Sequence, residues 1–245
     1  MIKRMDLNAD LGESWYTHRI GNDAELMPLL NSCNIACGFH GGDAVTLRNT
    51  IDLALEHKVA IGAHPSFPDR KHFGRRPMDI PAPDLYALLL YQVSALKGMV
   101  EAAGGVLHHL KPHGALYHYL NASIGGADAL ARVAVALHIP LIYGPPTGQL
   151  QLMAHVHELT FWAEGFADRA YEPSLHLRSR QKEGATLEDQ QVVMEQVRML
   201  VEEKAVVATD GKRYPLEVQT ICIHGDHPGA VARARHVREL LVSLG

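Results

Sequence analysis

The sequence has few cysteines, little net charge and no long apolar run, and each of these absences excludes a class of protein. The 245 residues carry a formal net charge of -4, with no basic tail or stripe, so no nucleic-acid-binding surface is expected. No apolar run reaches the length of a transmembrane helix, and the N-terminus lacks the apolar core of a signal peptide. We therefore expect a soluble cytoplasmic protein that acts on neither nucleic acids nor membranes.

Cysteine chemistry is not indicated either. The three cysteines, Cys33, Cys37 and Cys222, form no CxxC pair, and their odd number argues against a disulfide framework or a zinc knuckle. We interpret them as small buried apolar residues. The 16 histidines are the unusual feature of the composition, because several of them stand where strands should end.

Common nucleotide and nucleophile motifs are also missing. The chain has no GxxxxGK[ST] loop for nucleotide phosphates, since Gly211-Lys212 lacks the upstream glycine. It has neither a GxSxG nucleophile elbow nor an HExxH zinc motif. A P-loop for ATP and Ser-His-Asp nucleophilic catalysis therefore have no support in the sequence.

Strand-like runs alternate with helix-like runs along the whole chain, which predicts an α/β fold with a parallel sheet. Seven strands favour a seven-stranded distorted (β/α) barrel, formed by residues 1–245 as a single domain; an open doubly wound sheet is the alternative. A small hairpin is predicted at 206–208 and 213–214. The seven predicted strands are Arg4–Asp10, Cys33–His40, Val59–His64, Val106–His113, Pro140–Tyr143, Leu159–Glu164 and Thr220–Asp226.

Apolar residues at helical spacing predict the helices between these strands. The longest stripe runs from Leu85 to Val100, with Pro83 in its first turn. Asp43 precedes another stripe and is a suitable N-cap. Two further stripes, within 193–201 and 231–244, complete the pattern.

Polar residues gather at the carboxyl ends of the predicted strands. Because side chains alternate between the two faces of a strand, the residues that share a face can be read from their spacing. The polar faces are Asp6, Asn8 and Asp10; Ala60, Gly62 and His64; His109, Lys111 and His113; and Cys222, His224 and Asp226. Active sites of parallel α/β folds lie at this end of the sheet, so we expect a polar pocket there. The alternative for any single histidine is a strand cap or a core hydrogen bond.

Two loops resemble ligand clamps. Phe73-Gly74-Arg75-Arg76 places paired guanidinium groups in a loop, which suits a carboxylate, although a solvated basic loop is the alternative. Asp168 and Arg169 follow the sixth strand and are expected to form an ion pair that contacts the ligand. The alternative is a salt bridge that only stabilises the loop.

These segments together resemble the LamB/YcsF family. The resemblance covers nearly the whole chain from Asp6 onward, with mild departures at 16–19 and 178–185. It rests on the segments DLNADLGE, NIACGFHGGD, VAIGAHPSFPD, FGRR, KPHGALY, FADRAY and ICIHGDHPGA.

The resemblance implies a fold and an activity. The family has the distorted (β/α) barrel of polysaccharide deacetylases, and its activity is the ATP-dependent opening of 5-oxo-L-proline to L-glutamate. The family protein works with two partner subunits, B and C, and we expect these partners to bind the ATP.

The pocket residues can be given roles in such a reaction. Asp10, with Glu13 nearby, is the candidate general base; His64 and His113 are candidate acids or oxyanion donors; Lys111 could neutralise phosphate or oxyanion charge. The residues expected to carry the chemistry are Asp10, Glu13, His40, His64, Lys111 and His113. The residues expected to bind the substrate are Asn8, Arg76, Asp168, Arg169, His224 and Asp226.

Two other functions stay open. One is a metal-dependent amide or N-acetyl-sugar deacetylase, with a divalent metal that activates water on the side chains of Asp10, His40, His64 and His113. The other is a non-catalytic subunit that binds a small acid for partner enzymes.

Overall fold

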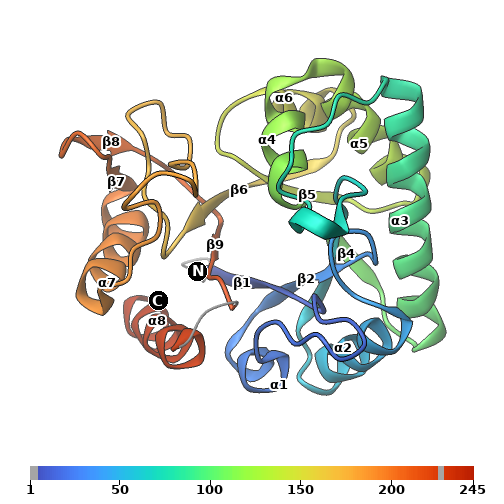
Figure 1. Cartoon of the computed structure of the whole chain (residues 1–245). Coiled ribbons are helices and arrows are strands. Elements are labelled where there is room, and N and C mark those ends of the chain that lie inside the picture. The colour runs from blue at the N-terminus through green and yellow to red at the C-terminus, as the bar shows by residue number, and fades with distance from the viewer. Residues whose placement is uncertain (1–4, 226–228) are drawn as a thin grey trace.

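The chain folds into a closed barrel of seven parallel strands surrounded by helices (Figure 1). The structure is a computed structural model that describes residues 5–225 and 229–245. The barrel strands, in the order in which they pair, are β1 Asp6–Leu11, β2 Ser32–Ala36, β3 Ala60–His64, β4 Leu107–Leu110, β5 Leu141–Gly144, β6 Thr160–Phe166 and β9 Thr220–Cys222.

The barrel closes because the last strand pairs with both the first and the sixth. Thr220 lies opposite Asp6 on one side and opposite Glu164 on the other. The predicted seven-stranded barrel is confirmed, and the open-sheet alternative is wrong. The predicted hairpin is confirmed as β7 Ala205–Val207 paired with β8 Arg213–Pro215.

Helices follow most of the barrel strands and cover the outside of the barrel. In Figure 1, α7 and the β7–β8 hairpin gather on one side, next to β6 and β9. The helices are α1 Asp23–Leu26, α2 Ala44–Glu56, α3 Ala82–Ala102, α4 Gly114–Ala122, α5 Ile124–Ala136, α6 Gln149–Val156, α7 Gln190–Arg198 and α8 Ala230–Leu244, with short helical turns η1 Met27–Leu29, η2 Arg70–His72 and η3 Met199–Glu203.

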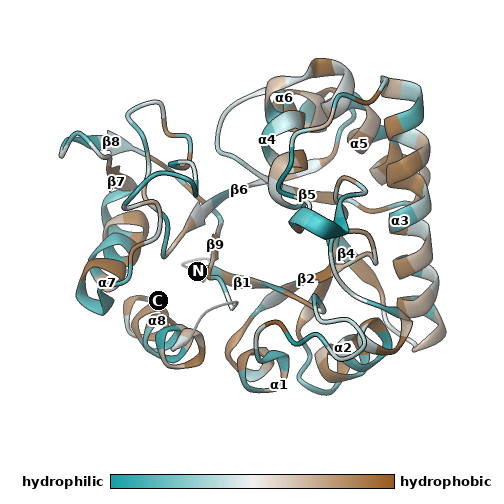
Figure 2. Cartoon of the chain, viewed as in Figure 1, coloured by the Kyte–Doolittle hydropathy of each residue, from teal (hydrophilic) through white to brown (hydrophobic). Residues whose placement is uncertain are grey.

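The predicted helix signals are confirmed. The Asp43 carboxylate accepts hydrogen bonds from the backbone amides of Val45 and Thr46, and so caps α2. A proline lies in the first turn of α3, and the stripe from Leu85 to Val100 is buried. Figure 2 shows helices that are brown on some faces and teal on others, as expected for elements that cover a core. No helix in the described ranges is both long and apolar enough to span a membrane.

Three strands end earlier than predicted. β9 stops at Cys222 instead of continuing towards Asp226, so His224 lies beyond the strand end. β2 stops at Ala36 instead of His40, because the chain then turns through Gly38 with a left-handed φ of 83°. β4 stops at Leu110 instead of His113, close to Pro112, which cannot donate a backbone hydrogen bond. His40 and His113 therefore lie on loops beyond the strand ends.

Parity along β1 separates an apolar exterior from a polar interior. Leu7, Ala9 and Leu11 belong to the hydrophobic core that also contains the buried stripes of the helices. The alternate residue Asn8 is fully buried among polar groups inside the barrel. The inside of this barrel is thus a buried hydrogen-bonded network, whereas the interiors of many (β/α) barrels are apolar.

One strand pair is distorted by a large side chain inside the barrel. The pairing of β3 with β4 shifts register between Ile61 and Gly62. A Cβ atom at Gly62 would lie 2.2 Å from Nε2 of His109, so only glycine leaves room for that imidazole. His109 in turn stacks on Tyr143, with 3.9 Å between ring centroids.

Candidate active site

A pocket of about 660 Å³ opens at the carboxyl ends of the barrel strands. Its floor comes from side chains at or just beyond the ends of β1, β3, β4 and β6. The floor and lower wall include Asp10, Glu13, His64, Lys111, His113, Tyr117 and Phe166. A pocket lined by polar residues therefore lies at the carboxyl ends of the strands, where we expected one.

A buried lysine joins two carboxylates below the pocket. Nζ of Lys111 donates to Oδ1 of Asp10 at 2.7 Å and lies 3.1 Å from Oε1 of Glu164. Lys111 is 2% exposed and Glu164 is 1% exposed. Sγ of Cys222 also lies 3.1 Å from the ammonium group, so this cysteine is part of the polar network and is more than an apolar filler.

These contacts determine which groups carry charge. Burial raises the pKa of Asp10, but His64 and Lys111 outweigh it and hold that pKa well below its usual range. Burial opposes the charge on Lys111, but Asp10 and other groups raise its pKa well above the usual value. Burial also raises the pKa of Glu164, and Lys111 offsets part of that rise. Asp10 and Lys111 therefore form a charged pair at neutral pH.

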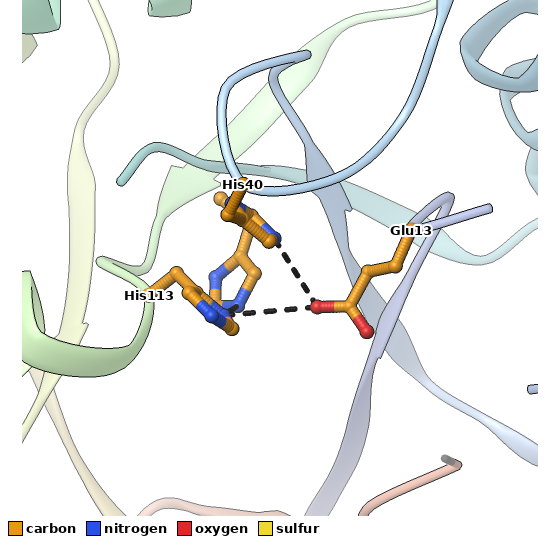
Figure 3. Close-up of side chains that lie close together, drawn as sticks. Glu13, His40 and His113 are labelled. Carbon is orange, nitrogen blue, oxygen red and sulfur yellow. Dashed lines mark hydrogen bonds and ion pairs between the residues drawn. The ribbon is translucent and has the colours of Figure 1, made fainter. Parts of the chain in front are cut away.

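Three histidines and Glu13 form a second cluster beside this pair (Figure 3). Oε1 of Glu13 lies 3.2 Å from Nε2 of His40 and 3.7 Å from Nδ1 of His113. The rings of His40 and His113 stack with a centroid distance of 3.7 Å. Nε2 of His64 lies 2.9 Å from Nδ1 of His113 and 3.2 Å from Oδ2 of Asp10. One ligand atom from each of Glu13 and the three histidines falls within 4.8 Å of all the others, so a metal ion could bind within this cluster.

Backbone carbonyls orient two of these rings. Nδ1 of His64 lies 2.7 Å from the carbonyl oxygen of Lys111, and Nε2 of His113 lies 2.8 Å from the carbonyl oxygen of Phe73. A carbonyl oxygen only accepts, so each of these ring nitrogens carries the hydrogen that it donates. Burial is the main reason that the pKa of His113 and the pKa of His40 are well below the usual value, which keeps both rings neutral.

A layer of buried amides supports the site from inside the barrel. Nδ2 of Asn34 donates to Asn8 at 2.8 Å and to Asp10 at 2.9 Å, while Nδ2 of Asn8 donates to Glu164 at 3.1 Å. Asn34 also contacts Nε2 of His109 at 2.8 Å. Asn8, predicted to bind substrate, therefore lies beneath the pocket and holds the residues above it.

Asn34, His109 and Glu164 were not among the predicted site residues. Glu164 is an acidic residue at the end of a predicted strand, and that position was the available signal. Asn34 shares a face of its strand with Ala36, which is not a chemically active residue, so the sequence carries no signal for it. Its role arises because β2 lies next to β1, which places Asn34 opposite Asp10.

The basic loop contributes Arg75 to the pocket. Arg75 lines the pocket wall and lies over the ring of Phe73, 4.9 Å from its centroid. Arg76, the predicted clamp, is exposed and is not among the lining residues. Phe73 and Gly74, which precede the two arginines, have left-handed backbone with φ of 55° and 63°.

The predicted ion pair beyond β6 is replaced by two separate interactions. Asp168 is fully buried and accepts from Nδ1 of His224 at 2.8 Å. Arg169 lines the pocket and donates to the carbonyl oxygens of Ala185 at 3.1 Å and of Arg178 at 2.6 Å. His224 also lines the pocket, so Asp168 acts by orienting it. Asp226, also predicted to bind substrate, lies outside the described residues.

Known proteins match the chain from end to end. The A subunit of a 5-oxoprolinase from Methylococcus capsulatus is 45% identical over 246 residues, covering 100% of this chain and 95% of that protein. The corresponding 5-oxoprolinase component of Bacillus cereus is 43% identical over 235 residues, covering 95% and 93%. The crystal structure of a lactam utilization protein from Thermus thermophilus superposes with a TM-score of 0.91 at 39% identity, covering 98% of this chain and 96% of that one.

A family model agrees with these relatives over almost the full length. The model described as the LamB/YcsF family matches residues 5–245. The motifs from DLNADLGE to ICIHGDHPGA supply Asp10, Glu13, His40, Lys111 and His113 to the pocket region described above. The chain belongs to the LamB/YcsF family.

Proposed function

We propose that this chain is the A component of an ATP-dependent 5-oxoprolinase, which opens the lactam of 5-oxo-L-proline to L-glutamate together with partner subunits. The observation that carries this proposal is the 45% identity, over the full chain, with a protein named as the A component of 5-oxoprolinase. The polar pocket at the barrel mouth supports it, because lactam hydrolysis needs a water-activating carboxylate and donors for an oxyanion.

The reaction adds water across the ring C–N bond. The hydroxyl group goes to the carbonyl carbon and a proton goes to the nitrogen. Asp10 is our candidate proton acceptor, since its contact with Lys111 keeps it in the ionised form that accepting a proton requires. A carboxylate with so low a pKa is a weak base, however, so it suits a water that another group has already made more acidic.

The substrate itself carries a carboxylate, and the upper pocket offers cationic partners for it. Arg75, Arg169 and Arg180 all line the pocket, above the carboxylates of its floor. Guanidinium groups bind carboxylates through paired N–H donors. We assign recognition of the 5-oxo-L-proline carboxylate to this arginine group, with Arg75 as its main member.

ATP enters the proposal through the partner subunits. Transfer of the γ-phosphoryl group of ATP to the lactam oxygen, with release of ADP, would activate the resonance-stabilised amide. The group leaves as inorganic phosphate as the ring opens, so each turnover consumes two water molecules and yields glutamate, ADP and phosphate. The chain lacks the GxxxxGK[ST] motif, so we propose that subunits B and C bind the nucleotide. Because the reaction consumes ATP, a cytoplasmic location is part of the same proposal.

The test is an assay of L-glutamate release from 5-oxo-L-proline and ATP, with the chain alone and with subunits B and C added. The chain alone should release little glutamate and hydrolyse little ATP, and the three subunits together should do both. ATP hydrolysis by the isolated chain would contradict the assignment of the nucleotide to the partners. Acetate release from N-acetylated sugars, with no glutamate formed in any mixture, would favour the deacetylase alternative instead.

A further inference from the structure

Two histidine nitrogens inside the site face each other, and each ring uses its second nitrogen for a backbone carbonyl. The carbonyl of Lys111 holds the N–H at Nδ1 of His64, and the carbonyl of Phe73 holds the N–H at Nε2 of His113. The other two nitrogens are Nε2 of His64 and Nδ1 of His113. These two atoms lie 2.9 Å apart, so one ion could contact both of them.

Two carboxylates approach the same two nitrogens. Oδ2 of Asp10 lies 3.2 Å from Nε2 of His64, and Oε1 of Glu13 lies 3.7 Å from Nδ1 of His113. The point between the rings is therefore faced by two ring nitrogens and two carboxylates, which belong to buried or largely buried side chains. Such an arrangement suits a cation, which is either a proton or a metal ion.

The geometry matches a metal ion better than a shared proton. Nitrogen and oxygen ligands lie about 2.0–2.1 Å from Zn²⁺ in tetrahedral sites, so neighbouring ligand atoms are about 3.3 Å apart. The separations of 2.9 Å and 3.7 Å bracket that value. Metal-bound histidines also commonly donate their second ring N–H to a backbone carbonyl, as both of these do.

His40 differs from the other two histidines. Its ring is parallel to that of His113 to within 1° and stacked 3.7 Å away, so one ion cannot lie in the planes of both rings. Nε2 of His40 instead contacts Oε1 of Glu13 at 3.2 Å, where an N–H can donate to the carboxylate. His40 is thus placed to orient Glu13.

We propose that His64, His113 and Glu13 bind one divalent metal ion of the zinc class, with His40 as the positioning residue for Glu13. Three protein ligands leave the fourth tetrahedral position open for water, and Glu13, His64 and His113 all line the pocket. A metal-bound water is far more acidic than free water, which suits the weak base Asp10. The metal site itself does not depend on which substrate the pocket takes.

The test uses the full chain without a polyhistidine tag, after treatment with a chelator and dialysis. Isothermal titration with Zn²⁺ should show one site, and Co²⁺ should give the intense visible absorption of a tetrahedral complex. Glu13→Gln and His113→Gln should each weaken Zn²⁺ binding by at least roughly 100-fold, and His40→Phe by roughly 10–100-fold, the range for residues that orient a ligand. His155→Asn, which removes an exposed histidine, is the matched control and should bind as the unaltered chain does.

Zn²⁺ should also raise the thermal midpoint of the unaltered chain and of the control, but not that of Glu13→Gln. The proposal fails if the unaltered chain binds no Zn²⁺ or Co²⁺ at millimolar concentration, or if Glu13→Gln and His113→Gln bind as tightly as the control. A variant that does not fold leaves the titration of the unaltered chain as the deciding result. Because no substrate or partner subunit is present, failure here is separate from failure of the proposed function.

Discussion

Replacing Lys111 with methionine removes the ammonium group that both Asp10 and Glu164 contact. At an effective dielectric of about 20, unit charges at 2.7 Å and 3.1 Å attract by about 6 and about 5 kcal/mol, which are upper limits. Burying each of the three charged side chains costs several kcal/mol of desolvation free energy. Their net contribution to folding stability is therefore much smaller than the sum of the two attractions. Removing one partner of a buried pair typically costs about 3–5 kcal/mol, and we expect Lys111→Met to fall in that range.

The assay is thermal unfolding followed by circular dichroism at pH 7. In a chain of this length 1 kcal/mol shifts the midpoint by roughly 2–4 °C, so Lys111→Met should lower it by roughly 10 °C. Lys97→Met is the matched control, because Lys97 pairs with Glu101 on the exposed surface of α3 and such pairs contribute less than about 1 kcal/mol. Equal midpoints for the two variants would refute the reasoning.

A second substitution checks that uncompensated charge causes the loss. Adding Glu164→Gln to Lys111→Met removes one of the carboxylates that the lysine had neutralised. The double variant should therefore be more stable than the sum of the two single effects predicts. Strict additivity would show that the cost of Lys111→Met comes from packing alone.

Four further predictions concern the pocket and the elements around it. Asp10→Asn should reduce activity of the assembled enzyme by roughly 100-fold or more while the chain still folds, and near-normal turnover would exclude Asp10 as the proton acceptor. Arg75→Ala should raise KM for 5-oxo-L-proline more than it lowers kcat, whereas Arg76→Ala should leave KM unchanged; the reverse order would return the clamp to Arg76. Hydrogen bonds from backbone amides hold the pKa of the Asp43 carboxyl below its usual range. The cap therefore stabilises the folded chain fully above about pH 4, the pKa of an unfolded aspartate. This stabilisation is lost as the pH falls through the lower pKa of the folded state. Asp43→Ala should accordingly cost about 1 kcal/mol of unfolding free energy in urea at pH 7, and the difference from the unaltered chain should shrink in acid. Burial raises the pKa of Cys37 to about 12, so a thiol reagent at about pH 8 should label it only after unfolding, and rapid labelling of the native chain would contradict its burial.

Local periodicity was enough to predict the parts of the fold that depend on neighbours along the chain. The spacing of Asp6, Asn8 and Asp10 predicted a polar inner face for β1, and each of the three has inward polar partners. The stripe of α3 and the cap of α2 were also predicted, because both are set by residues within one or two helical turns. The closed barrel followed from the number of strands.

Features that depend on strand register or loop conformation were beyond sequence reasoning. Arg75 and Arg76 are chemically identical neighbours, and only the loop backbone decides which one faces the pocket. Asp168 was expected to pair with the adjacent Arg169, but barrel closure brings it to His224, 56 residues away. Glu164 gained its role because Lys111, which follows a different strand, reaches across the barrel interior to it.

The closed pairing of the barrel also limits how other proteins can attach. Each barrel strand has a hydrogen-bonded neighbour on both sides, so no barrel strand presents an edge to which a foreign strand could be added. The two-stranded β7–β8 sheet is the exception in the described part of the chain, since β8 pairs with β7 alone. Assembly with partner proteins is therefore expected to use helix faces and the loops around the pocket mouth, or to extend this small hairpin, and in either case the barrel itself keeps its shape.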